Sequence, residues 1–460
     1  MVVAGAGAMP SAIQASAEGE QPLEYIVVLR QDANLNRTID RHTERQDVNV
    51  THVYEYALKG YAAMIEVDDL QAVRSDPAVL FVTDAFDPAA GIGRVVPRSI
   101  TRDGAAASTH GLAARAVEQP SQVTKVALMR IGADRSSALS GNGRGDVDIN
   151  VAVLDTGIQP NHPDLDVKGG RNCTPGGVNN WRDPDGHGTM VAGFVGALDN
   201  EIGVVGVAPG ANLYAVKVSD PLATNPEFEI TDAALVCGLD WVASTHFDGN
   251  KKNDIDVANL SLGGTTYTDD DNCGRTARDA VHFAICGIVA AGVVPVAAAT
   301  NEGEDFARTS PATYDEVLTV TAIAAGDAVP GGLAGILPCL LPDYEQRDDE
   351  FAFFSDFFTT EDDAAHTVAA PGVCMTSTFI GSQYAFGSGT SFATPLVTGT
   401  VALCISSGTC KNLTPQQIVR KIVLDARAYN EANPDYGFLG DPIRPVPNKS
   451  FGYLINAALY

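Results

Sequence analysis

From Ile149 onward, apolar segments of strand length alternate with segments of helix length, and this alternation restricts the fold more than any other feature of the chain. The expected strands are Ile149–Leu154, Asn212–Val218, Val257–Ser261, Val293–Ala299 and Val317–Ile323. The expected helices are His187–Ala197, Thr231–Thr245, Thr276–Gly292, Ser391–Ile405 and Pro415–Leu424. Continuous apolar strands separated by helices indicate a parallel sheet with helices on both faces. The sequence therefore predicts an α/β fold, in which functional side chains gather at the carboxyl ends of the strands.

Three short motifs rich in small residues place an aspartate, a histidine and a serine on this framework. Asp155 ends the apolar run VAVLDTG, His187 lies in DGHGTMVAG, and Ser391 lies in GTSFATP. A hydroxyl becomes a nucleophile when a neighbouring base removes its proton, and a neutral imidazole needs a carboxylate to fix its tautomer. The three residues are therefore the expected catalytic nucleophile (Ser391), base (His187) and orienting acid (Asp155).

These motifs, in the chain order Asp, His, Ser that subtilisin has, resemble those of the subtilisin family of serine proteases. The likeness extends to SFGYLIN near the C-terminus. It implies a subtilisin-like parallel sheet preceded by a small α+β propeptide domain, and a secreted serine endopeptidase that cuts polypeptides through an acyl-enzyme. The segment AAATNEG resembles the oxyanion-asparagine segment of the family. Asn301 and the Ser391 amide are thus expected to stabilise the oxyanion.

The resemblance also implies a substrate-binding region, because VANLSLGG is similar to the family strand that pairs with the substrate backbone. The expected pocket residues are Ser261, Leu262, Gly263, Ala298, Thr300 and Thr309. Thr300 departs from the family pattern, in which glycine is usual, and Thr309 falls near a position that is often glycine. Two β-branched side chains would narrow the pocket and favour small to medium P1 residues. Glu302 near the rim could instead favour Lys or Arg.

A structural Ca²⁺ site is a further implication of the resemblance. HPDL supplies Asp164, and ALDNEIGV is similar to the calcium loop of the family. The expected ligands are the side chains of Gln122, Asp164 and Asn200 and the carbonyls of Leu198, Ile202 and Val204. Six oxygen ligands suit a cation of this size and hardness. The alternative is a loop that carries a surface aspartate.

The chain before this region divides into three segments. Residues 1–22 are apolar and small, with an A-x-A pattern but no basic start, and are interpreted as a truncated export signal or a disordered tail. Residues 23–86 resemble the inhibitory propeptide of the family, with strands expected at 25–29, 52–56, 61–67 and 79–83 and helices at 36–47 and 68–75. Residues 87–120, rich in Ala, Gly, Pro and Arg, are the expected linker with the maturation site. The peptidase domain is expected at 121–460.

Charge and cysteine content limit the partners and the compartment. The 57 acidic and 30 basic residues give a net charge of −27, which argues against nucleic acid or an anionic membrane as the main partner. No apolar run reaches the ~18 residues that cross a bilayer. The 8 cysteines favour disulfides in an exported protein, and local spacing suggests only Cys404–Cys410. Cys237 and Cys286 could equally be small buried core residues. We expect a monomer.

Two alternatives to a protease remain open at this point. The first is a hydrolase of another acyl substrate, such as an esterase, for which a G-x-S-x-G motif would be typical. The serine motif here is GTSFA instead. The second is an inactive binding protein that presents a groove.

Overall fold

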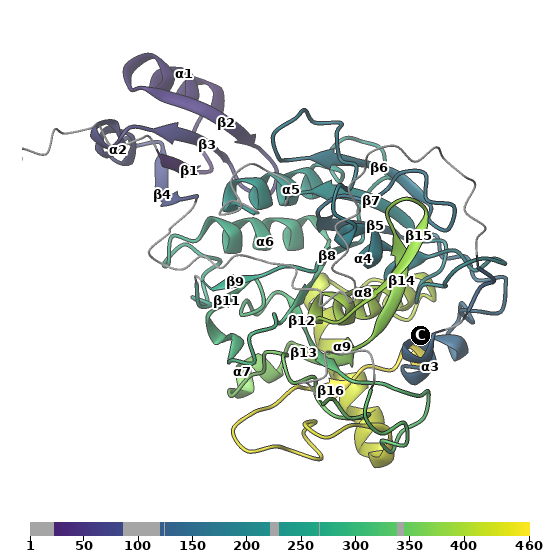
Figure 1. Ribbon diagram of the computed structural model, residues 1–460. Coiled ribbons are helices and arrows are strands. Elements are labelled where there is room, and N and C mark those ends of the chain that lie inside the picture. Colours follow the sequence, from purple (N-terminus) through teal and green to yellow (C-terminus); the bar gives the residue numbers. More distant parts are fainter. Residues whose placement is uncertain (1–22, 86–119, 124, 221–229, 266, 338–344) are drawn as a thin grey trace, which may run out of the picture.

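The computed structural model describes residues 23–85, 120–123, 125–220, 230–265, 267–337 and 345–460. The expected export signal at 1–22 and nearly all of the expected linker at 87–120 lie outside the described residues. The described chain forms a small N-terminal unit and a large α/β domain (Figure 1).

The N-terminal unit is an antiparallel sheet of four strands in the order β2-β3-β1-β4. Its elements are β1 (Leu23–Leu29), α1 (Leu35–Arg45), β2 (Val48–Tyr54), β3 (Gly60–Ile65), α2 (Val67–Arg74) and β4 (Val79–Asp84). Side chains alternate across a strand, so Val27 and Tyr61 pack on the side of α2, while Ile26, Val28 and Ala62 face the large domain. The expected strands and helices of this unit are all present, but the strand expected at 52–56 is β2 at Val48–Tyr54, so its predicted bounds were wrong.

The large domain is built on eight parallel strands in the order β16-β13-β12-β10-β8-β5-β7-β6. Their bounds are β5 (Asn150–Asp155), β6 (Val167–Asn172), β7 (Asn212–Lys217), β8 (Val257–Leu260), β10 (Val294–Ala298), β12 (Leu318–Ile323), β13 (Thr367–Pro371) and β16 (Tyr453–Leu454). The predicted α/β fold with a parallel sheet is confirmed. Strands β6, β13 and β16 were not predicted. Strand β6, at one edge, has only one apolar residue, Val167, and β16, at the other edge, is only two residues long.

Helices cover both faces of this sheet, as predicted. The face toward which Val151 and Val153 point is covered by α4 (His187–Gly196), α8 (Thr390–Ser406) and α9 (Pro415–Ala432). The opposite face, toward which Ala152 and Leu154 point, is covered by α5 (Asp232–Ser244) and α6 (Ala280–Ala291).

The predicted bounds of two of these helices were wrong. Helix α9 continues past Leu424 to Ala432, and α6 begins at Ala280 rather than Thr276, because the Asp279 carboxylate accepts two amide hydrogen bonds as its N-cap.

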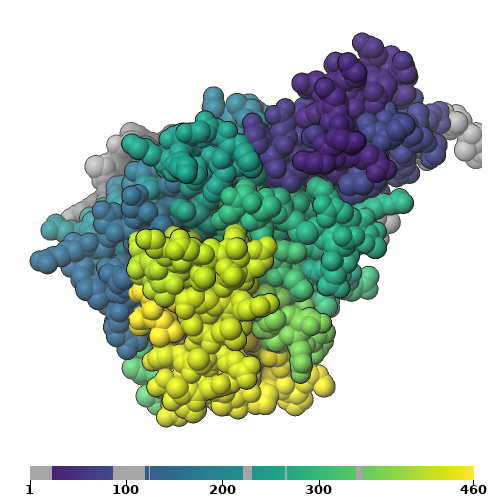
Figure 2. All heavy atoms as spheres, turned by 180° about the vertical axis from the view of Figure 1, so that it is seen from behind, coloured from purple at the N-terminus to yellow at the C-terminus, as the bar shows by residue number. Residues whose placement is uncertain are grey.

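Shorter elements complete the described chain. They are α3 (Val126–Arg130), β9 (Gly264–Thr265), β11 (Thr309–Ser310), α7 (Glu361–Ala364), β14 (Met375–Phe379) and β15 (Gln383–Gly387). The N-terminal unit lies on the outer side of α5 and α6, and from behind it forms a lobe on the main body (Figure 2). No described helix is long and apolar enough to span a membrane.

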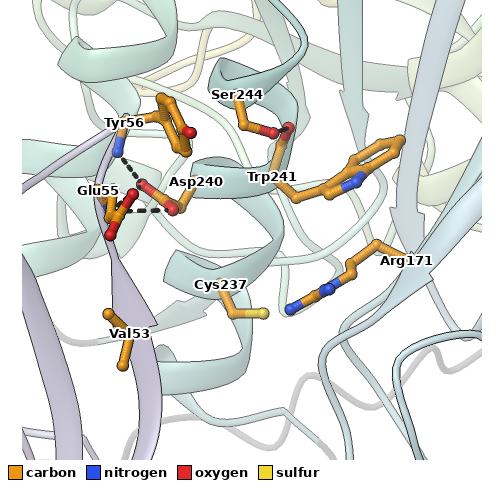
Figure 3. A pocket seen from close by; sticks show the side chains of 8 residues that line it. All are labelled: Val53, Glu55, Tyr56, Arg171, Cys237, Asp240, Trp241 and Ser244. Carbon is orange, nitrogen blue, oxygen red and sulfur yellow. Dashed lines mark hydrogen bonds between the residues drawn. The ribbon is translucent and has the colours of Figure 1, made fainter. Parts of the chain in front are cut away.

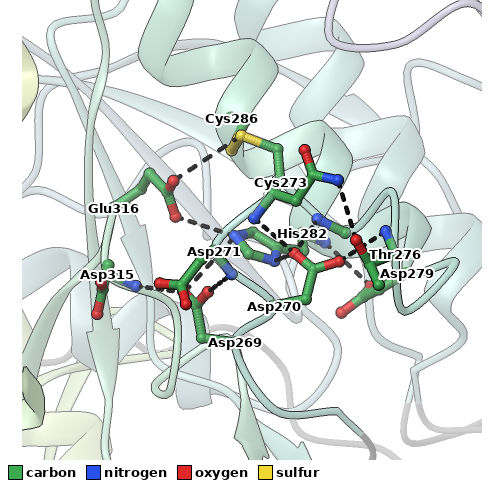
Figure 4. The surroundings of a disulfide bond; sticks show 12 residues. Asp269, Asp270, Asp271, Cys273, Thr276, Asp279, His282, Cys286, Asp315 and Glu316 are labelled. Atoms are coloured by element: carbon green, nitrogen blue, oxygen red, sulfur yellow. Dashed lines mark hydrogen bonds and ion pairs between the residues drawn. A yellow bond between two sulfur atoms is a disulfide. The ribbon is translucent and has the colours of Figure 1, made fainter.

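Disulfides join three pairs of described cysteines. The predicted Cys404–Cys410 bond is confirmed. Cys237 and Cys286 are not free core residues, because they form the Cys173–Cys237 and Cys273–Cys286 bonds. Carboxylates and His282 surround the last of these bonds (Figure 4).

Candidate active site

Asp155 and His187 come together where β5 ends and α4 begins. The His187 Nδ1 atom lies 2.8 Å and 3.0 Å from the two carboxylate oxygens of Asp155, and both side chains are buried. Burial alone would lower the pKa of His187, but the charge and hydrogen bond of Asp155, together with the charges of Asp185 and Asp183, outweigh it and raise the pKa. Such a pair holds the imidazole in one tautomer, with its other nitrogen free to accept a proton.

A second buried aspartate, which sequence reasoning did not single out, organises the loop before His187. The Asp183 carboxylate accepts hydrogen bonds from the amides of Asp185 and Gly186 and from the amide and hydroxyl of Thr189. It also accepts from the Thr156 hydroxyl at 2.8 Å, so it links the residue after Asp155 to the start of α4. Asp183 therefore positions both halves of the Asp155–His187 pair.

Ser391 lies in the first turn of α8, directly before Phe392. The ring of its neighbour Phe392 packs against the His187 imidazole at 5.4 Å between centroids and against Phe194 at 5.6 Å. The Ser391 carbonyl accepts a 2.7 Å hydrogen bond from the Ser261 hydroxyl. Nε2 of His187 has no hydrogen-bond partner among the described residues. This is the nitrogen that a serine hydroxyl would need, and such contacts often tighten only when substrate binds.

Asn301 follows β10 and reaches the same turn of α8. Its Oδ1 accepts from the amide of Thr390 at 2.8 Å and from the Thr390 hydroxyl at 3.0 Å, which leaves Nδ2 as a donor. A Cβ atom on Gly389 would lie 3.7 Å from the Ser391 amide nitrogen and 3.8 Å from both Nδ2 and Oδ1 of Asn301. The two expected oxyanion donors thus border one space, which the missing side chain of Gly389 keeps open.

Three of the expected pocket residues meet beside this space. A Cβ atom on Gly263 would lie 2.6 Å from the Thr300 methyl carbon and 3.6 Å from that of Thr309. Strand β11, which carries Thr309, pairs with β9 directly after Gly263. Ala298, at the end of β10, and Leu262, in the loop after β8, are both buried. The Ser261 hydroxyl donates to the Ser391 carbonyl, so it stabilises the first turn of α8.

The residues expected to bind Ca²⁺ also lie together. The Gln122 side-chain nitrogen contacts the carbonyls of Leu198 and Val204 at 2.9 Å and 3.3 Å, so these oxygens converge on one point. Asn200 donates to the Asp164 carboxylate at 2.9 Å. Tyr384, which no sequence motif indicated, also donates to this carboxylate, at 3.2 Å.

Ile202 belongs to the same loop, and its amide donates to Asn200 Oδ1 at 2.7 Å. Burial raises the pKa of Asp164 to about 6, because the charged carboxylate loses its hydration. A cation would stabilise that charged form. Oxygen donors that converge on one point beside a desolvated carboxylate fit a calcium ion.

Asp269, Asp270 and His282 form another group whose ligand atoms lie within 4.8 Å of one another. The Asp270 carboxylate already accepts four backbone amide hydrogen bonds. Nε2 of His282 is 3.0 Å from Glu316, as the close-up shows (Figure 4). These contacts are those of an ion-pair cluster that organises the loop beside the Cys273–Cys286 bond.

Comparison with known proteins connects this geometry to a family. The sequence profile of the Subtilase family matches residues 146–439. Subtilisin NAT of Bacillus subtilis subsp. natto is 36% identical over 275 residues, which are 59% of this chain and 59% of that protein. Subtilisin of Bacillus pumilus is 36% identical over 275 residues, 82% of its length. An alkaline protease of Shouchella clausii is 32% identical over 372 residues, which are 81% of this chain and 75% of that protein.

Proposed function

Because the chain belongs to the subtilase family, we propose that it is a serine endopeptidase that hydrolyses peptide bonds through an acyl-enzyme intermediate. The observation that carries the proposal is the buried Asp155–His187 pair, with its free Nε2, beside the turn that presents Ser391. The shared space between the Ser391 amide and Asn301 Nδ2 supports it further.

Each residue then has one role in the reaction. The Ser391 hydroxyl attacks the peptide carbonyl, while Nε2 of His187 accepts its proton and later returns it to the leaving amine. Asp155 accepts the hydrogen bond from Nδ1–H of His187 and stabilises the imidazolium. Asn301 and the Ser391 amide donate to the oxyanion, where preorganised donors act most strongly. Water then hydrolyses the acyl-enzyme with His187 as base.

Labelling with a fluorophosphonate, combined with hydrolysis of casein, tests this proposal. We expect one label per chain, at Ser391, and casein hydrolysis that falls in proportion to the label, because the activated hydroxyl is the nucleophile for both reactions. Labelling and ester hydrolysis without peptide cleavage would identify an esterase instead. A chain that takes up no label would be the binding protein.

We also propose that Ca²⁺ stabilises the loop between Leu198 and Val204. Gln122, Asp164 and Asn200 would supply side-chain oxygens, and Leu198, Ile202 and Val204 would supply carbonyls. The bound ion would offset the buried charge of Asp164 and connect the segment around Gln122 to the end of α4. The convergence of two carbonyls on Gln122 supports this assignment.

Removal of calcium should therefore lower the melting temperature and shorten the half-life at high temperature. Binding at a free concentration of one hundred Kd contributes about 2.7 kcal/mol to stability. Asp164→Asn should abolish the difference between calcium and a chelator, because the charged ligand is lost. Glu201→Gln, an exposed change in the same loop, should preserve it. Equal melting temperatures of the wild type in calcium and in chelator would exclude the site.

The N-terminal unit is proposed to be an inhibitory propeptide. Its contacts with the large domain are specific: the Asp240 carboxylate of α5 accepts hydrogen bonds from the backbone amides of Glu55, Tyr56 and Ala57. Glu55, Tyr56 and Asp240 line a pocket together with Arg171 and Trp241 (Figure 3). The Tyr54 hydroxyl also donates to the Ala233 carbonyl of α5 at 3.0 Å. The disulfides among the described cysteines support the further proposal of secretion, because such bonds persist in oxidising compartments.

Gly287 of α6 offers a selective test of the propeptide, because a Cβ atom there would lie 2.0 Å from the Ala57 carbonyl oxygen. Gly287→Leu should displace the N-terminal unit and raise the rate at which a fluorophosphonate labels freshly purified precursor, by about tenfold or more given the cost of overpacking. Ala290→Leu, an exposed change on the same helix, serves as the control. If Gly287→Leu is labelled no faster than the control, the unit does not block the site.

A further inference from the structure

Thr300, directly before Asn301, adopts an unusual backbone conformation. Its φ is +82°, in a region that β-branched residues rarely enter because their side chain is crowded there. Such conformations persist only where the surroundings hold them, and they concentrate at functional sites. The contacts that hold Thr300 therefore also determine where Asn301 lies.

Those contacts come from Asp356, a buried residue 56 positions along the chain. Its Oδ2 accepts a 2.6 Å hydrogen bond from the Thr300 hydroxyl, and its backbone amide donates to the Thr300 carbonyl at 3.1 Å. Its Oδ1 accepts from the amides of Glu302 and Glu304 at 2.8 Å and 3.0 Å. One carboxylate thus binds the loop on both sides of Asn301.

The same hydrogen bond orients the Thr300 side chain toward the pocket. With the hydroxyl on Asp356, the Thr300 methyl lies next to Gly263, where it occupies the space that a Cβ atom would enter. Rotation of the side chain would break the bond to Asp356. This hydrogen bond therefore fixes the wall of the pocket, and together with the other Asp356 contacts to the loop it determines where Asn301 lies.

We propose that Asp356 is a positioning residue that acts through Thr300, holding Asn301 at the oxyanion and fixing the Thr300 methyl as a wall that selects small P1 side chains. The inference rests on the proposed endopeptidase function. Asp356 and Thr300 would then influence both kcat and P1 specificity, although neither residue transfers a proton to the substrate or forms a covalent bond with it.

Two substitutions at Thr300 separate the two effects. Thr300→Val keeps both branches at Cβ but cannot donate to Asp356. It should lower kcat by about 10- to 100-fold, as expected for a misplaced group, with little change in KM for a substrate with alanine at P1. Thr300→Ser keeps the hydroxyl and lacks the methyl. It should restore most of that kcat and shift kcat/KM several-fold toward phenylalanine at P1.

Thr359→Val is the matched control, because Thr359 donates to Asp305 at 2.6 Å across the same two segments but is exposed and makes no described hydrogen bond to Thr300, Asn301 or Asp356. Its kcat should equal that of the wild type. Asp356→Ala, alone and combined with Thr300→Val, completes a double-mutant cycle. For residues that act as one unit, the double variant loses little more kcat than the worse single variant.

The outcomes distinguish failure of the inference about Asp356 and Thr300 from failure of the proposed endopeptidase function. Equal kcat values for Thr300→Val and Thr300→Ser in an active protein would overturn the inference and leave the proposed function intact, as would additive losses in the cycle. If the wild type hydrolyses no peptide, both proposals fail. Melting temperatures of all variants identify any loss that is due to unfolding, and in that case Thr300→Ser decides by its change in P1 preference.

Discussion

Ser391→Ala should lower kcat for peptide hydrolysis by about six orders of magnitude, the loss measured when the serine of subtilisin itself is removed. In the proposed mechanism, attack by the Ser391 oxygen forms the acyl-enzyme, while the variant keeps the proposed oxyanion donors of the backbone and Asn301. Alanine is a good helix former and Ser391 lies in the first turn of α8, so the fold should be retained. The loss of kcat in this variant should therefore come from the missing hydroxyl and not from unfolding.

Intact mass over time, measured in calcium, reports the same step on the chain's own linker. The wild type should lose its first ~100–120 residues, the length implied by the position of the expected linker, and Ser391→Ala should stay at full length. Ser406→Ala, at the exposed end of the same helix, should mature like the wild type. Processing of Ser391→Ala at the wild-type rate would assign the nucleophile to another residue.

Asp155→Asn should reduce kcat by about 10⁴-fold although it changes a single atom. An amide at this position donates to Nδ1 rather than accepting from it, so the imidazole carries its proton on Nε2 and cannot take one from Ser391. The rates are to be compared by single-turnover hydrolysis. Asp166→Asn, which removes a carboxylate from an exposed ion pair with Lys168, provides the reference.

The pH profile of Asp155→Asn adds a second readout. Asp155 raises the pKa of His187 against the effect of burial, and activity requires the neutral imidazole. Loss of the carboxylate should therefore move the acid limb of kcat/KM to lower pH. An acid limb that stays in place would mean that Asp155 does not contact the base in solution.

The features that could be predicted from the sequence are those determined by neighbouring residues in the chain. The motifs around Asp155, His187 and Ser391 each lie at a junction between an apolar strand or helix and a turn, and the structure has β5, α4 and α8 at those places. The apolar alternation likewise predicts the parallel sheet, because burial on both faces demands it.

The features that sequence reasoning missed depend on pairs of distant polar residues. Asp183 and Thr156 are 27 positions apart, and Asp356 and Thr300 are 56 apart, so neither contact has a local signature. The Cys173–Cys237 and Cys273–Cys286 bonds are of the same kind, since eight cysteines allow 105 pairings. The positive φ of Thr300 is a property of the folded loop, although a threonine in place of glycine was its visible sign.

The aromatic ring of Phe392, packed between His187 and Phe194, has a consequence for chemical durability. A methionine side chain at that place would offer peroxide a sulfur atom, and its sulfoxide would bring a polar oxygen against the imidazole. A phenyl ring offers no such atom. The residue that follows the proposed nucleophile therefore offers mild oxidants no sulfur atom, and peroxide should not disturb the contact with the imidazole by oxidising it.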